Sequence, residues 1–387
     1  MKRSFIAILL ICIGFFLYGN SQTEQLTILK KTFYRGNLQD KIQVVTETSV
    51  LEGDFEEIYL IALDFVVDYA DILKDDSSMI DLAKITVENL EKIKSKNILD
   101  QIFNLFSSYD SDILKFKILE SIAGMKINDE NFNVIINEYG ESLLASNEKF
   151  ELLPDFISVL EKLNNPSFFN MLFKIAAAEN LNGDVKKQAE KAIASIDGNN
   201  KSNMISIIEN GNIEEKQLAL RIVLNNDKNS DFLRAEIAEK ALQVSILYIG
   251  DIENKNQLIN FQLDAIRELR RVSWTRSSDL VVQFFNYARS EYETGLIKED
   301  EYLEIISCVE ELASTKASAL FSDYLAFFNS QTEQGISCSE PVVFAVIQAL
   351  GNLGNKIAFD NLLYVGYLSY SEEIIEASRI ALAGLKF

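Results

Sequence analysis

The chain has 387 residues, of which 48% are hydrophobic and 25% charged, so it can bury a large apolar core. Its formal net charge of −21 argues against binding to nucleic-acid phosphates or to anionic lipid head groups. The sequence contains no histidine, which excludes histidine-based catalytic triads and dyads, histidine zinc sites and histidine-ligated haem. We therefore expect a non-catalytic protein that has no cofactor and no nucleic-acid partner.

The N-terminal segment 1–21 has the pattern of a secretory signal peptide. Two basic residues precede an apolar run from Phe5 to Tyr18, and small residues follow where cleavage before Gln22 is expected. This run is shorter than the roughly 20 residues that span a bilayer, although an uncleaved anchor is the alternative interpretation. We expect export to the periplasm or cell surface of a bacterium, with no integral membrane segment after cleavage.

The turn-forming residues are few, with three prolines and 16 glycines, which favours helices over β-sandwiches or barrels. Between about residues 118 and 353 one apolar spacing recurs, in which a last core residue is preceded by apolar residues three and seven positions earlier. This is the buried stripe of a helix with 3.6 residues per turn. The stripes are Ile118/Ile122/Met125, Phe156/Leu160/Leu163, Ala189/Ile193/Ile196, Ala265/Leu269/Val272, Ile305/Val309/Leu312 and Val346/Leu350/Leu353.

A second apolar stripe begins eight to ten residues after most of these helices, so each unit is predicted to be a helical hairpin. The last core residues lie 33 to 41 positions apart, except for one gap of 76 that leaves room for a further hairpin around residues 213–247. A period near 40 is typical of proteins built from stacked helix pairs. The sequence therefore predicts an all-α fold.

The clearest unit lies near the C-terminus. Its first helix ends in Ala349-Leu350-Gly351-Asn352-Leu353-Gly354, and the whole unit, residues 340–387, resembles the short bacterial HEAT-like repeat. The resemblance implies an α-solenoid over residues 22–387, with about eight or nine hairpins in a curved superhelix. The clearest repeats are expected at 300–387, and the turn-rich stretch 197–203 is a candidate joint between repeats.

Nearer the N-terminus, residues 54–73 and 78–96 are predicted to form two amphipathic helices. The first would place Asp64, Asp68, Asp71 and Asp75 on one face. Such a stripe can bind a divalent cation or supply an acid and a base, but a solvated helix face is the simpler interpretation. The calcium-loop-like sequence 227–231 lacks the required glycine and glutamate, which favours an ordinary loop.

The stretch 267–276, RELRRVSWTR, concentrates arginine around the chain's only tryptophan. On a predicted helix over 256–272 the first three arginines point away from the core, and Ser277 or Ser278 can cap the next helix. One interpretation is structural, since cations suit a helix C-terminus. The other is a partner-binding patch, since arginine and tryptophan are enriched at binding hot spots. The candidate partner-binding residues are Arg267, Arg270, Arg271, Trp274 and Arg276.

The two cysteines outside the leader, Cys308 and Cys338, are either a disulfide or two free thiols. Taken together, these features predict an exported binding or scaffold protein that recognises protein partners through an extended surface. Some bacterial HEAT-like proteins resemble chromophore lyases, so an enzyme or enzyme subunit with a carboxylate-based site is one alternative. A structural subunit of a cell-envelope assembly is another.

Overall fold

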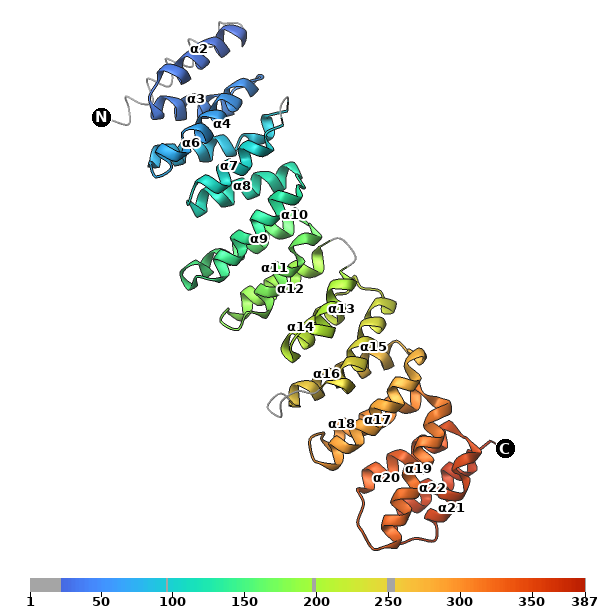
Figure 1. Cartoon of the computed structure of the whole chain (residues 1–387). Helices are drawn as coiled ribbons and strands as arrows, with labels where there is room; N and C mark the ends of the chain where they lie inside the picture. The colour runs from blue at the N-terminus through green and yellow to red at the C-terminus, as the bar shows by residue number, and fades with distance from the viewer. Residues whose placement is uncertain (1–21, 95–96, 197–199, 249–254, 387) are drawn as a thin grey trace, which may run out of the picture. The chain divides into compact units, whose positions relative to one another are not determined.

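The computed structural model describes residues 22–94, 97–196, 200–248 and 255–386, so the predicted signal peptide lies outside the described residues. The described part contains 21 α-helices and no β-strand, apart from one isolated parallel bridge between Asn355 and Lys386 (Figure 1). The predicted all-α class is confirmed. Across the described residues, no helix combines the length and apolar character that crossing a bilayer requires.

The chain divides into two compact units. The first comprises residues 1–176 and 180–197, and the second comprises residues 177–179 and 198–387. The candidate joint at 197–203 overlaps this boundary, although residues 197–199 lie outside the described part.

The helices of the first unit are α2 Gln22–Arg35, α3 Leu38–Val50, α4 Glu56–Asp68, α5 Ala70–Leu73, α6 Ser77–Val87, α7 Leu99–Ser108, α8 Asp112–Met125, α9 Glu130–Leu144, α10 Leu153–Leu163, α11 Phe169–Ala177 and α12 Gly183–Ser195. Those of the second unit are α13 Lys201–Asn210, α14 Ile213–Asn225, α15 Asp231–Leu247, α16 Lys255–Arg271, α17 Ser278–Glu293, α18 Glu299–Leu312, α19 Ser314–Glu333, α20 Glu340–Leu353, α21 Phe359–Val365 and α22 Glu372–Ala383.

Within the second unit, alternate helices pack against one another. Helices α14, α16, α18, α20 and α22 contact in succession, and so do α13, α15, α17, α19 and α21. The first unit shows the same alternation in α3, α6, α8, α10 and α12. Each helix is therefore covered by the next helix along the chain and by the next but one, which makes the structure repeat-like.

The first two residues of every predicted stripe are buried, while the last residue is buried in two stripes and partly exposed in the other four, at Met125, Leu163, Val272 and Leu353. In α18, for example, Ile305 and Val309 are fully buried and Leu312 is 2% exposed. The gap of 76 residues contains the additional pair α14 and α15, at the place where a further hairpin was predicted.

Each of these helices ends at the last residue of its predicted stripe or one residue before it. The next residue has a left-handed backbone after four of the stripes: Lys126, Asn164, Ser273 and Gly354. A residue in this conformation directs the chain away from the helix axis and lets the final carbonyls accept hydrogen bonds. Only glycine adopts it without steric cost, so Gly354 suits its position better than the other three.

Two predicted helices near the N-terminus are shorter than expected. The segment 54–73 breaks at Tyr69, whose ψ of 6° is not helical, and continues as the separate short helix α5. Residues 65–67 are aromatic or β-branched and therefore have a lower helix propensity than alanine or leucine. Ala70, just after the break, is buried. The segment 78–96 is helical only to Val87 and then forms a 3₁₀ turn at Leu90–Lys92.

This break corrects the predicted acidic face. Asp64 and Asp68 lie on α4, whereas Asp71 lies on α5 and Asp75 lies in the turn before α6. Among the residues that the structure describes, no group of three carboxylate or cysteine side chains is arranged to hold a metal ion.

The first two helices of each unit are joined by the same sequence motif, which reads GNLQDK in residues 36–41 and GNIEEK in residues 211–216. In both copies the asparagine caps the second helix, and the acidic residue three positions later completes a capping box. Both glycine N–H groups donate to a carbonyl of the preceding helix at 2.8 Å.

The lysine that ends each motif is buried. Lys41 Nζ donates to the carbonyls of Phe33 and Gly36 at 2.6 and 2.7 Å. Lys216 Nζ donates in the same way to Ile208 and Glu209 at 2.6 and 2.9 Å. The two lysines thus satisfy carbonyls left open at the end of a helix, and burial lowers the pKa of both side chains.

The last helices of the two units are preceded by the same succession of local structures. In each, a left-handed residue is followed by an asparagine cap, a 3₁₀ turn and a helix that begins with phenylalanine. These segments are 164–169 in the first unit and 354–359 in the second. By this correspondence, α2 is the counterpart of α13, α11 of α21, and α12 of α22.

Two glycine replacements are expected to change stability in opposite directions. Gly354→Ala should lower the free energy of unfolding by about 1 kcal/mol or more, because φ is 65° and the new Cβ meets the Gly384 carbonyl at 3.2 Å. Gly124→Ala, in α8 with open space around it, should raise that free energy by about 0.5–1 kcal/mol. Urea denaturation measures both, and a change of the same sign in both variants would contradict the assigned helix ends.

Candidate functional site

The stretch 267–276 forms the end of α16 and the turn into α17. Helix α16 covers residues 255–271, within one residue of its predicted bounds. Ser273 has a φ of 54° and donates its N–H to Arg270 O, while Trp274 N–H reaches back to Leu269 O at 2.9 Å. These two bonds form a Schellman motif, with serine in the position that glycine usually takes.

The predicted cap of α17 is only partly correct. Ser277 occupies the N-cap position, but its side chain accepts no backbone hydrogen bond. Its hydroxyl donates instead to Trp274 O at 2.8 Å, across the 3₁₀ turn Thr275–Ser277. This bond ties the tryptophan to the start of the next helix.

Two of the candidate arginines pair with the neighbouring helix α18. Arg267 makes a forked contact with Glu304, with Nη2 to Oε2 at 2.6 Å, and Arg270 Nη2 lies 2.5 Å from Glu311 Oε1. The Arg267 hydrogen bonds lower the pKa of the Glu304 carboxyl. These arginines lie outside the apolar core, as predicted, and their guanidinium groups join one repeat to the next.

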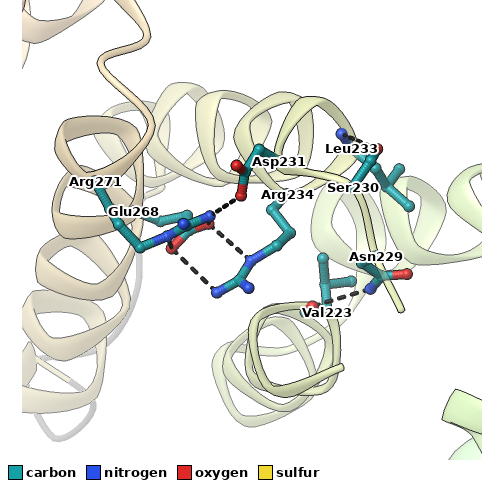
Figure 2. A network of polar contacts seen from close by, with 8 residues as sticks. All are labelled: Val223, Asn229, Ser230, Asp231, Leu233, Arg234, Glu268 and Arg271. Atoms are coloured by element: carbon teal, nitrogen blue, oxygen red, sulfur yellow. Dashed lines mark hydrogen bonds and ion pairs between the residues drawn. The ribbon is translucent and has the colours of Figure 1, made fainter. Parts of the chain in front are cut away.

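The third arginine belongs to a network around a buried carboxylate (Figure 2). Glu268 is 5% exposed and receives Arg271 from its own helix, at 2.9 and 2.8 Å, and Arg234 from α15, at 2.8 Å. Arg271 also pairs with Asp231 and thereby lowers the pKa of that carboxyl. A buried carboxylate flanked by two guanidinium groups is stable only while both remain in place.

Trp274 and Arg276 share a single partner on α15. The indole Nε1–H donates to Glu239 Oε2 at 2.8 Å, and Arg276 Nη2 donates to the same oxygen at 2.7 Å. The Arg276 guanidinium lies 4.6 Å from the Trp274 ring centroid, and Phe232 meets that ring edge-on at 5.4 Å. Arg276 is exposed, whereas Trp274 is partly buried.

The acidic partners of these residues were not predicted from the sequence. The missed residues are Asp231, Glu239, Glu268, Glu304 and Glu311, together with Arg234. A usable signal is present in the sequence, because six of the seven pairs described above join residues 34 to 41 positions apart, which is one repeat. Opposite charges separated by one period predict contacts between neighbouring helix pairs.

A groove on the second unit is lined by residues of α13, α15 and α17, and Arg276 is part of its lining. Its volume is about 610 Å³. The apolar part of its lining consists of Ile205, Ile246, Leu247 and Leu280. The charged part consists of Lys201, Lys240, Arg276, Glu236, Glu239 and Asp279.

Two other candidates from the sequence have structural explanations. In the loop 227–231, Ser230 caps α15, while Asn229 donates to Val223 O at 2.9 Å. Cys308 and Cys338 are both free thiols. Cys308 is buried, and burial raises its pKa to about 11.

No protein-family model matches the chain, and a search of curated proteins finds no similar sequence. The resemblance of residues 340–387 to HEAT-like repeats therefore stays a prediction from the sequence.

Removing an arginine from the buried network should cost more than removing one from the surface. Arg234→Ala leaves buried Glu268 with only one guanidinium and is expected to lower the free energy of unfolding by about 2–3 kcal/mol. Arg267→Ala breaks a partly exposed pair and should cost less than about 1 kcal/mol. Chemical denaturation of both variants tests this order, and equal losses would contradict it.

The Arg267–Glu304 pair should also contribute to pH dependence. Because the folded-state pKa of Glu304 is lowered, its stabilisation is complete above the unfolded pKa of about 4.3 and is lost as pH falls through the folded value. In Arg267→Met the Glu304 pKa should rise and this acid-dependent loss should shrink, whereas Arg267→Lys should preserve part of the effect. Carboxyl NMR titration measures the pKa, and an unchanged Glu304 pKa in Arg267→Met would refute the assignment.

Proposed function

We propose that the protein is an α-solenoid of HEAT-like repeats that acts as an exported, non-catalytic scaffold and binds protein partners in the bacterial envelope. The helix pairs, their period near 40 residues and the alternate packing of helices within each unit support this proposal. The leader-like composition of residues 1–21 supports export. Fold analogy alone does not specify a function, so the proposal also needs a binding surface on the repeats.

The observation that carries it is the groove across α13, α15 and α17. Leu247 is 75% exposed, and it lines the groove together with other apolar side chains and with side chains of both charges. A strip of apolar surface with a polar rim is the usual composition of a protein-binding site. An amphipathic segment of a partner protein fits this lining, because its apolar face can cover Leu247 while its charged side chains meet the rim.

Within this proposal the candidate arginines have different roles. Arg267 and Arg270 pair with Glu304 and Glu311 of α18, whereas Arg271 pairs with Glu268 of its own helix and with Asp231 of α15. The contacts with α18 and α15 keep the repeats in register. Arg276 borders the groove and is exposed, so it is available to a partner's carboxylate at its outer side. Trp274 holds the Arg276 guanidinium in place by stacking.

In-cell photo-crosslinking tests the groove. A photoreactive amino acid in place of Gln283, on the groove lining, should give discrete adducts identified by mass spectrometry. Leu247→Glu in the same chain should abolish those adducts without lowering the melting temperature, because the side chain is exposed.

The matched control places the photoreactive group at Lys187, an exposed position on α12 of the first unit. Identical adducts from Lys187 and Gln283, or adducts that persist in Leu247→Glu, would show that the groove is not the binding site.

A further inference from the structure

The last two helices that the structure describes carry exposed apolar side chains. Leu363 on α21 is 42% exposed, Tyr367 just after it is 76% exposed, and Ile380 on α22 is 66% exposed. The counterpart of Leu363 in the first unit is Phe173, which is only 6% exposed. The counterpart of Ile380 is Lys191, a charged and exposed residue. Helices α21 and α22 therefore present an apolar surface at positions that the first unit buries or fills with charge.

Helix α2 also exposes apolar side chains, with Ile28 at 47% and Tyr34 at 68% exposure. Helix α2 carries a net positive charge, opposite in sign to that of the whole chain. It contains the bases Lys30, Lys31 and Arg35 and one acid, Glu24. In α21 and α22 the balance is reversed. Those two helices carry the acids Asp360, Glu372, Glu373 and Glu376 against the single base Arg379.

The opposite charges of α2 and of α21 and α22 indicate which surfaces belong together, and the order of helices in the chain is compatible with that pairing. Along the sequence α13 follows α12, and these helices are the counterparts of α2 and α22. The correspondence is specific, since both α2 and α13 precede the glycine-asparagine motif with its buried lysine. A second copy whose α2 is placed after α22 would repeat the helix order that the chain already contains.

We propose that α2 of one copy docks on the α21–α22 surface of a second copy, so that the protein self-associates head to tail. The two surfaces differ, so each copy keeps one unused surface of each kind after docking and further copies can add in series. Apolar burial of Tyr367 and Ile380 supplies the attraction, and the opposite charges of α2 and α22 select the orientation.

Sedimentation velocity of the purified protein, expressed from the full-length sequence, tests this proposal. The average mass should rise with protein concentration, and the association should weaken in 0.5 M salt because the charged contribution is screened. A single monomeric species at every concentration up to several hundred micromolar would overturn it.

Two blocked variants separate head-to-tail docking from a symmetric dimer. The tail-blocked variant is Leu363→Glu with Tyr367→Glu, and the head-blocked variant is Ile28→Glu with Lys31→Glu. Each should be monomeric alone, and an equimolar mixture should form one heterodimer and nothing larger, because each partner keeps one intact surface. Self-association of either variant alone, or no heterodimer in the mixture of folded variants, would overturn the proposal.

Val134→Glu is the matched control, since Val134 is 56% exposed and lies on α9, a helix that belongs to neither surface. It should associate as the unmodified protein does. Circular dichroism should show unchanged helix content and melting temperature for all variants, because every replaced side chain is exposed.

Discussion

A pair of antiparallel helices cannot bury its own apolar stripes, and this constraint governs the structure. The stripe of α18 is buried because α16, α17, α19 and α20 all pack against it. Full burial of one such side chain contributes about 1.5–3 kcal/mol, whereas an exposed ion pair contributes about 0–1 kcal/mol. Contact between neighbouring helix pairs is therefore the main stabilising interaction, and each pair depends on the pairs beside it.

The same dependence explains where the arginines are. Packing of neighbouring pairs brings residues one repeat apart to the same edge of a unit, and opposite charges at that edge meet. Arg267 and Glu304 are 37 positions apart in the sequence, and Trp274 and Glu239 are 35 apart. The buried Glu268 favours one register of the neighbouring helices. A shift of one helix past the other would leave its carboxylate without its guanidinium partners.

The sequence predicts the parts of the fold that follow from helical periodicity. The stripes, the helix ends after Met125, Leu163, Val272 and Leu353, and the additional pair at 213–247 all follow from spacing. The break at Tyr69 does not follow from spacing, because apolar residues of the segment continue past it to Leu73.

The site was less predictable than the fold. The concentration of arginine in 267–276 is visible in the sequence, but its acidic partners lie on other helices and are found only once the packing is known. The buried Lys41 and Lys216 went unnoticed for a related reason. Lysine is rarely buried, and only the carbonyls of the preceding helix explain why these two are.

If neighbouring pairs supply the burial, protection should depend on the number of neighbours. Native-state hydrogen exchange across the second unit measures this directly. In the monomeric tail-blocked variant, the slowest amide exchange is expected in α16 and α18, which have neighbours on both sides, and the fastest in α21 and α22. Equal protection in α16, α18, α21 and α22 would contradict the claim that each helix pair is held by the pairs beside it.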